Sequence, residues 1–226
     1  RVLALIHGSF AGIVFSMMAA LAVVTSRRWN DVNGEPPKAH GPRPVGLNKL
    51  KTLTVAATLL ILLQSALGGL LRHLGTALFE HVGLAFVVLA VVIATGTVAM
   101  CSGMNWLKRS GAMLLLLVAL QAALGAGAFV TKYGFPPTGY VAVQHAPLQV
   151  ALRTSHTVVG MLLLAASVVC ALRVFRLAAF ARANPPLAAK RSNEGRAMTD
   201  RETASEALRV GNRVIGASPT AKGGAA

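Results

Sequence analysis

Five apolar stretches, each about as long as a membrane-spanning helix, limit the fold of this chain more than any other feature. They cover residues 2–25, 53–71, 82–100, 111–131 and 157–172. A helix needs about 20 mainly apolar residues to cross a bilayer, and a lone strand cannot satisfy its backbone in lipid. Leu, Ala and Val fill these stretches without period-two alternation. The sequence therefore predicts an all-α polytopic membrane protein with five transmembrane helices.

The composition agrees with this class and argues against two others. Hydrophobic residues make up 54% of the 226 residues and charged residues only 13%, whereas soluble domains carry about 25% charged residues. Disordered chains are poor in apolar residues. The formal net charge is +15, but Lys and Arg are concentrated between the apolar stretches, and aromatic residues make up only 5%. We therefore expect a lipid bilayer around the chain and no nucleic-acid partner.

The distribution of positive charge predicts the orientation of the chain. Cytoplasmic connections carry an excess of Lys and Arg. The second and fourth connections hold only Arg72, Lys132 and Arg153. The first and third connections and the start of the tail hold Arg27, Arg28, Lys38, Arg43, Lys49, Lys51, Lys108, Arg109, Arg173, Arg176 and Arg182. The tail is therefore expected in the cytoplasm and the start of the chain on the outer side, while the inverted topology would misplace eleven of these fourteen charges.

An internal repeat divides the spans into two types. The motif QSALGG, which begins at Gln64, returns as QAALGA 57 residues later at Gln121. The other three spans each carry a histidine near their start, at His7, His81 and His156, with separations of 74 and 75 residues. The two types alternate along the chain, so the predicted orientation places the three histidines at one depth near the outer face.

Histidine at this depth is a functional hypothesis by default, because polar groups inside a span are costly. Two imidazoles on facing helices of a bundle can ligate the iron of a heme from its two sides. Glycines at 68, 69, 125 and 127 can give flat helix faces for a porphyrin, or simply let helices pack closely. Each histidine can also be a structural residue at the membrane interface, and Gln64 and Gln121 can serve only to hydrogen-bond neighbouring helices.

Two arginines are expected near the same outer surface. Arg72 and Arg153 can pair with the propionates of a heme through charge-assisted hydrogen bonds, or extend to lipid phosphates. His73 follows Arg72 outside the predicted span and is expected to face solvent, and His40 and His145 fall in connections and receive no role.

The order and spacing of these segments resemble the carboxy-terminal part of a heme A synthase. Residues 64–73, His81, residues 121–126 and residues 156–160 carry the resemblance, which covers about residues 1–176. This family of cytochrome oxidase assembly proteins has eight spans in two similar four-helix halves. The chain matches its last five spans.

The resemblance implies an oxidoreductase that oxidises a ring methyl group of heme O to a formyl group, giving heme A for terminal oxidases. It implies a heme b cofactor between His81 and His156, with Gln64, Gln121, Arg72 and Arg153 around it. His7 matches a ligand of the substrate heme O. The catalytic residues of the family lie on a span upstream of this sequence, so the chain is expected to hold the cofactor but to be inactive alone.

The resemblance also implies a domain plan. Residues 1–29 are expected to be the last span of a truncated amino-terminal half, residues 30–51 a cytoplasmic linker, and residues 52–176 the four-helix heme b bundle. Residues 177–226, rich in small and charged residues, are expected to be a disordered cytoplasmic tail. The bacterial inner membrane is the implied location, and heme O synthase and oxidase assembly factors are possible partners. A b-type cytochrome that only relays electrons and a non-enzymatic transporter or scaffold are the alternatives.

Overall fold

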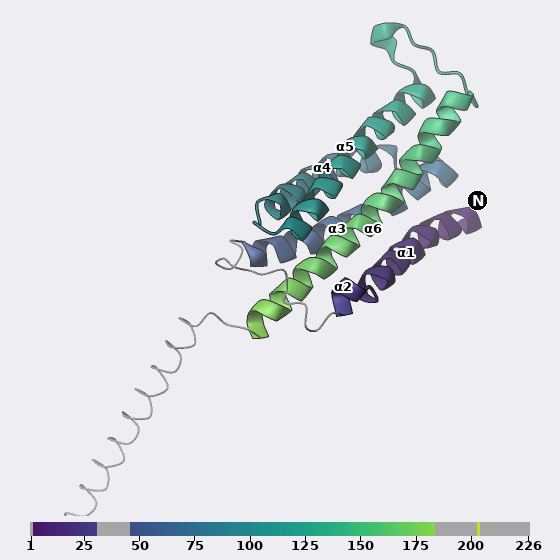
Figure 1. Ribbon diagram of the computed structural model, residues 1–226. Helices are drawn as coiled ribbons and strands as arrows, with labels where there is room; N and C mark the ends of the chain where they lie inside the picture. The colour runs from purple at the N-terminus through teal and green to yellow at the C-terminus, as the bar shows by residue number, and fades with distance from the viewer. Residues whose placement is uncertain (1, 31–45, 184–202, 204–226) are drawn as a thin grey trace, which may run out of the picture. The chain divides into compact units, whose positions relative to one another are not determined.

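Each of the five predicted spans is a helix in the computed structural model, which describes residues 2–30, 46–183 and 203. The five long helices are α1 (Val2–Val24), α3 (Leu47–Leu74), α4 (Leu78–Met100), α5 (Asn105–Tyr133) and α6 (Pro147–Ala183), and all five are long and apolar enough to cross a membrane (Figure 1). A short helix α2 (Arg27–Asn30) and a 3-10 turn (Pro136–Thr138) complete the described helices. No strand occurs in these ranges, so the predicted all-α membrane class is confirmed.

The helices continue beyond the apolar stretches that revealed them. Helix α3 begins inside the predicted linker, and α6 begins ten residues before its predicted span and includes residues 177–183, which were predicted to be tail. A helix of 37 residues is about 55 Å long, well beyond the bilayer core. Local backbone signals set the limits of the helices instead. Gly75, after α3, and Gly134, after α5, have positive φ, and Pro147 is the first residue of α6. The remaining linker and tail residues lie outside the described ranges.

Helices α3 to α6 pack around a shared core. Thr58 of α3 hydrogen-bonds Ser167 of α6 at 3.2 Å, and Arg173 of α6 donates to Ser110 of α5 at 2.6 Å. Helices α4 and α5 touch backbone to backbone, because a Cβ added at Gly111 would lie 2.5 Å from the carbonyl oxygen of Gly96. These contacts lie within the compact unit formed by the described residues up to 179.

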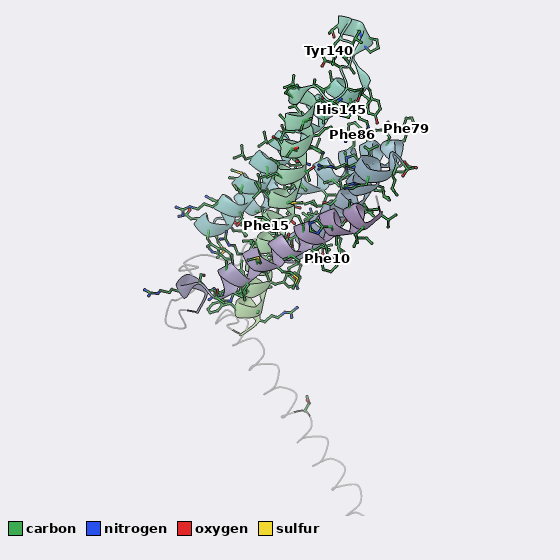
Figure 2. The ribbon with its side chains drawn as sticks, turned by 90° about the vertical axis from the view of Figure 1, so that its right-hand side faces the viewer. Phe10, Phe15, Phe79, Phe86, Tyr140 and His145 are labelled. Carbon is green, nitrogen blue, oxygen red and sulfur yellow. The ribbon has the colours of Figure 1, made fainter. Side chains whose placement is uncertain are left out.

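Helix α1 lies against the outside of this bundle. Small residues allow its close approach: a Cβ at Gly69 of α3 would lie 2.6 Å from Leu5, and one at Gly12 of α1 would lie 3.7 Å from Met161 of α6. Large apolar side chains point away from the bundle, among them Phe10 of α1 and Phe79 and Phe86 of α4, which are 62, 86 and 68% exposed (Figure 2). Exposed aromatic side chains on apolar helices are what a lipid-facing surface requires.

The buried apolar core occupies only one half of the bundle. Its members come from residues 50–61 of α3, 88–99 of α4, 107–118 of α5 and 159–178 of α6. Between these segments, at residues 62–87 and 119–158, no apolar side chain is buried, and the buried side chains there are the polar Thr131 and Gln149. We call residues 62–87 and 119–158 the histidine half, because His81 and His156 lie in it. This half lacks the close apolar packing that fills most protein interiors.

The Gly96–Gly111 contact leads to a test of the fold. In Gly111→Ala the new methyl group meets backbone, which cannot move aside as a side chain can, so α4 and α5 must separate. We expect the free energy of unfolding to fall by about 1–3 kcal/mol, measured by denaturant unfolding in detergent micelles. Gly12→Ala is the matched control, since its methyl group makes an ordinary contact with a side chain. Equal stability of both variants would contradict the close helix crossing.

Candidate functional site

The two histidines of the repeat meet inside the bundle. His81 lies in the first turn of α4, after a turn in which Gly75 and Ala77 adopt positive φ, and His156 lies in the third turn of α6. Their ring centroids are 6.4 Å apart and the ring planes are nearly perpendicular, at 82°. Helices α4 and α6, which are not consecutive in the chain, therefore bring two imidazoles together face to edge in the histidine half.

Each histidine is accompanied by the glutamine of the neighbouring helix. The amide nitrogen of Gln64 lies 3.5 Å from His81 Nε2 and donates to the backbone carbonyl oxygen of His81 at 2.8 Å. The amide nitrogen of Gln121 lies 3.3 Å from His156 Nε2. The repeated motif therefore produces the same glutamine–histidine pair twice, once between α3 and α4 and once between α5 and α6.

The glycines of the motif make room for the imidazoles. A Cβ at Gly68 would lie 3.1 Å from His81 Cε1, and a Cβ at Gly125 would lie 3.0 Å from His156 Cε1, both closer than ordinary contacts. The following glycines, Gly69 and Gly127, face leucine side chains of α1 and α6. The sequence-based suggestion that these four glycines offer flat faces to a porphyrin is therefore wrong, because each is already covered by a side chain of the protein.

Unpartnered polar atoms are concentrated at this site. Five buried side-chain nitrogen or oxygen atoms lack a hydrogen-bond partner in the described parts of the chain, and four belong to the glutamine–histidine pairs: Gln64 Oε1, His81 Nδ1, Gln121 Oε1 and His156 Nδ1. Buried polar atoms without partners are rare, since each costs about 1–3 kcal/mol. Their presence at one level of the bundle indicates that the protein alone does not complete this site.

The spacing of the rings suits two ligands of one metal ion. A metal–imidazole bond is about 2.0 Å and a ring nitrogen lies about 1.15 Å from its centroid, so two axial imidazoles place their centroids about 6.3 Å apart. The observed 6.4 Å agrees. No group of three or more His, Cys, Asp or Glu side chains that could hold a metal occurs in residues 2–30 and 46–183.

Positive charge lies beside His156. Arg72 of α3 reaches across to α6, where its Nη1 donates to Thr157 Oγ1 at 3.0 Å, and Thr157 in turn donates to the carbonyl oxygen of Arg153 at 3.0 Å. Glu80 is the only acidic residue in the described ranges, and neither arginine is in an ion pair there. The Arg72 guanidinium thus reaches the residue next to His156, whereas Arg153 takes part in this chain of bonds through its backbone. The sequence analysis did not predict a role for Thr157, although its position next to His156 could have indicated one.

Other histidines lie apart from the pair. His7 is exposed on α1, on the outside of the bundle, and has no recorded contact with His81 or His156 within the described chain. His73 lies in the last turn of α3, half-buried, with Nε2 3.8 Å from the position of a Cβ on Gly8 of α1. It therefore faces α1 rather than solvent, contrary to expectation. His145 lies in the connection between α5 and α6 (Figure 2), and His40 falls outside the described residues.

The connection after α5 is held by a buried amide. Gln149 is only 2% exposed; its Nε2 donates to the carbonyl oxygen of Thr131 at 2.9 Å, and its Oε1 accepts from the backbone N–H of His145 at 3.0 Å. These bonds fix the start of α6, and with it the height of His156. The sequence analysis missed this residue, because a glutamine ahead of an apolar stretch does not by itself indicate burial.

Surface grooves elsewhere offer no comparable chemistry. One groove is lined by apolar residues of α1, including Val14 and Met17, together with Leu172 of α6. A second is lined by residues of α3, including Lys51, and by Phe175. Their nearly pure carbon lining suits acyl chains of lipids rather than a reaction.

Comparisons with known proteins give no match: no family model, no curated protein and no solved structure resembles this chain significantly. The interpretation of the site therefore depends on its own geometry.

Two glycine substitutions test the geometry of the pair. Gly125→Ala places a methyl group 3.0 Å from the His156 ring, and Gly68→Ala does the same for His81 at 3.1 Å, so each ring must shift by a few tenths of an ångström. We expect the affinity for added hemin, followed by optical titration in micelles, to fall by about tenfold in each variant. Gly12→Ala, remote from both rings, should bind hemin like the wild type. Unchanged affinity in the first two variants would show that the ring positions do not matter.

Proposed function

We propose that the chain binds heme b between His81 and His156 and is the cofactor-binding part of a heme A synthase-like membrane oxidoreductase. One observation carries the heme assignment: two imidazoles from α4 and α6 have ring centroids 6.4 Å apart, among four buried polar atoms without partners. In the half of the bundle around them, residues 62–87 and 119–158, no apolar side chain is buried, which supports a site that a large and mainly apolar group would complete.

The residues of the chain would have separate tasks in this site. His81 and His156 would hold the iron from two helices, while Gly68 and Gly125 admit their rings. Heme b supplies one-electron transfer when bound. With both histidines holding the iron, the site would suit electron transfer rather than oxygen binding. The apolar residues below it, such as Val88 and Val159, would exclude water from the site.

Arginines near the histidines would fix the orientation of the macrocycle. The Arg72 guanidinium contacts Thr157, the residue after His156, and Arg153 precedes His156 by three residues on α6; neither is paired with a carboxylate in the described ranges. Guanidinium groups bind carboxylates through strong, directional hydrogen bonds. We therefore assign the propionates to this side of the site.

The synthase activity is the part of the proposal that depends on the resemblance. The order of the glutamine and histidine motifs supports oxidation of the heme O methyl group to a formyl group, for cytochrome oxidase biogenesis. His7 would contribute to the site of the substrate heme, and its exposure on α1 leaves it accessible to a group outside the bundle. The positive charges support a bacterial inner membrane location with the histidine half toward the outer face.

An electron-relaying b-type cytochrome is the second candidate. It is favoured by the absence of any carboxylate other than Glu80 among the described residues, since no further acid or base stands near the histidine pair. This candidate needs the same heme but no substrate porphyrin. A transporter or scaffold, the third possibility, needs no heme.

Histidine substitutions test the heme site directly. Protein purified from heme-supplemented cells should show a low-spin spectrum, and the near-perpendicular rings should give a highly anisotropic low-spin EPR signal. His81→Ala or His156→Ala should abolish this signal, because one axial ligand is lost. His73→Ala and His145→Ala are controls that should retain it. Purified wild-type protein without a Soret band would count against both redox functions.

A product assay separates the synthase from the relay. The chain is coexpressed with a source of heme O and with the amino-terminal half that the resemblance implies, and extracted hemes are identified by chromatography and mass spectrometry. We expect heme A or its hydroxylated precursor, lost in His81→Ala and absent when the 226-residue chain is expressed alone. Bound heme b without any modified heme would instead support the electron relay.

A further inference from the structure

We propose that Gln64 is a positioning residue that keeps the electron pair of His81 Nε2 free for a metal, and that Gln121 does not constrain His156 in this way. The inference rests on the proposed function for its purpose, but its evidence is the hydrogen bonding of the side chains themselves. It predicts that His81 and His156 differ in which ring nitrogen carries the proton, although the sequence repeat makes the two histidines look equivalent.

The orientation of the Gln64 amide is determined by the backbone. The atom 2.8 Å from the carbonyl oxygen of His81 must be the NH₂ nitrogen, because two oxygen acceptors cannot share a hydrogen bond. An amide whose nitrogen and oxygen are otherwise hard to distinguish is therefore unambiguous at this position. Gln64 presents N–H groups, and not an acceptor, to its surroundings on the His81 side.

The same nitrogen lies 3.5 Å from His81 Nε2. An N–H group on Nε2 would point at another donor, so the neutral imidazole is favoured with its proton on Nδ1 and its electron pair on Nε2. This is the tautomer that a metal at Nε2 requires. When a metal occupies Nε2, Gln64 gives up this long contact but keeps its stronger bond to the backbone.

Gln121 lacks the second anchor. Its amide nitrogen lies 3.3 Å from His156 Nε2, but no backbone carbonyl in residues 46–183 accepts from it. Its neighbour on the other side is Gly160, where a Cβ would lie 3.1 Å from the amide nitrogen. Since no second bond fixes which end of this amide faces the ring, the Gln121 side chain does not by itself determine which nitrogen of His156 carries the proton.

Nitrogen-15 NMR of histidine side chains in the heme-free full chain, in micelles, tests the inference. Protonated and unprotonated ring nitrogens have well-separated shifts, and single His→Ala variants assign the signals. We expect His81 as one tautomer, with the proton on Nδ1, and His156 as a mixture. This experiment needs no bound heme, so its result is independent of the proposed function.

Substitution of the glutamines supplies the second readout. Gln64→Glu replaces the donor with an acceptor, so His81 should move its proton to Nε2, and hemin affinity should fall by about tenfold or more. Gln64→Leu removes the hydrogen-bond donor beside the ring, so His81 should become a mixture of both tautomers. Hemin affinity should fall less than in Gln64→Glu. Gln144→Glu is the matched control: it loses the bond from the Gln144 amide nitrogen to the carbonyl oxygen of Lys132 but keeps an oxygen that can accept from Gln149, and it should not change either tautomer.

The outcomes separate the two ideas. A wild-type His81 protonated on Nε2, or a His81 signal that does not change in Gln64→Glu and Gln64→Leu, overturns the role of Gln64. An equally fixed tautomer at His156 overturns the inequality of the ligands. The third outcome is that both histidines show the expected tautomers but the protein binds no hemin. This result supports the positioning role of Gln64 and contradicts the proposed heme function.

Discussion

The need to pair every polar group inside a membrane protein is the constraint on which this site depends. In a bilayer no bulk water satisfies a buried amide or imidazole. The helices bring Gln64, His81, Gln121 and His156 to one level, yet four of their atoms stay unpartnered. Such an arrangement is costly unless a ligand completes it, so the unsatisfied atoms are stronger evidence for a bound group than the histidines alone.

The repeat explains how so short a chain builds this arrangement. One motif, with a glutamine and a glycine one turn later, supplies a hydrogen-bond donor and a gap, and the next helix fills the gap with an imidazole. Using the motif twice places two imidazoles opposite each other. The two copies differ in one bond, from Gln64 to the backbone of His81, and that bond removes the equivalence of the histidines.

Hydropathy and the internal repeat predict the spans and three histidines at one depth, and the resemblance selects the pair of His81 and His156. None of these predicts where the helices end or which side chains surround the rings. Long apolar stretches have few alternatives in a membrane, so the five helices follow from the sequence. The ends of α3 and α6 do not follow from it, because helical turns with polar residues extend these helices beyond the apolar stretches. The glycines were misassigned for a related reason: a sequence shows that Gly68 is small, but not that His81 lies against it. The heme and the chemistry remain predictions.

The uneven packing of the bundle has a consequence for its biogenesis. Interlocked apolar side chains such as Leu107, Leu114 and Val174 join all four helices at one end without help from any prosthetic group. Insertion into the membrane and packing of this end can therefore precede the binding of the proposed heme, so the four helices would already be assembled when the group arrives.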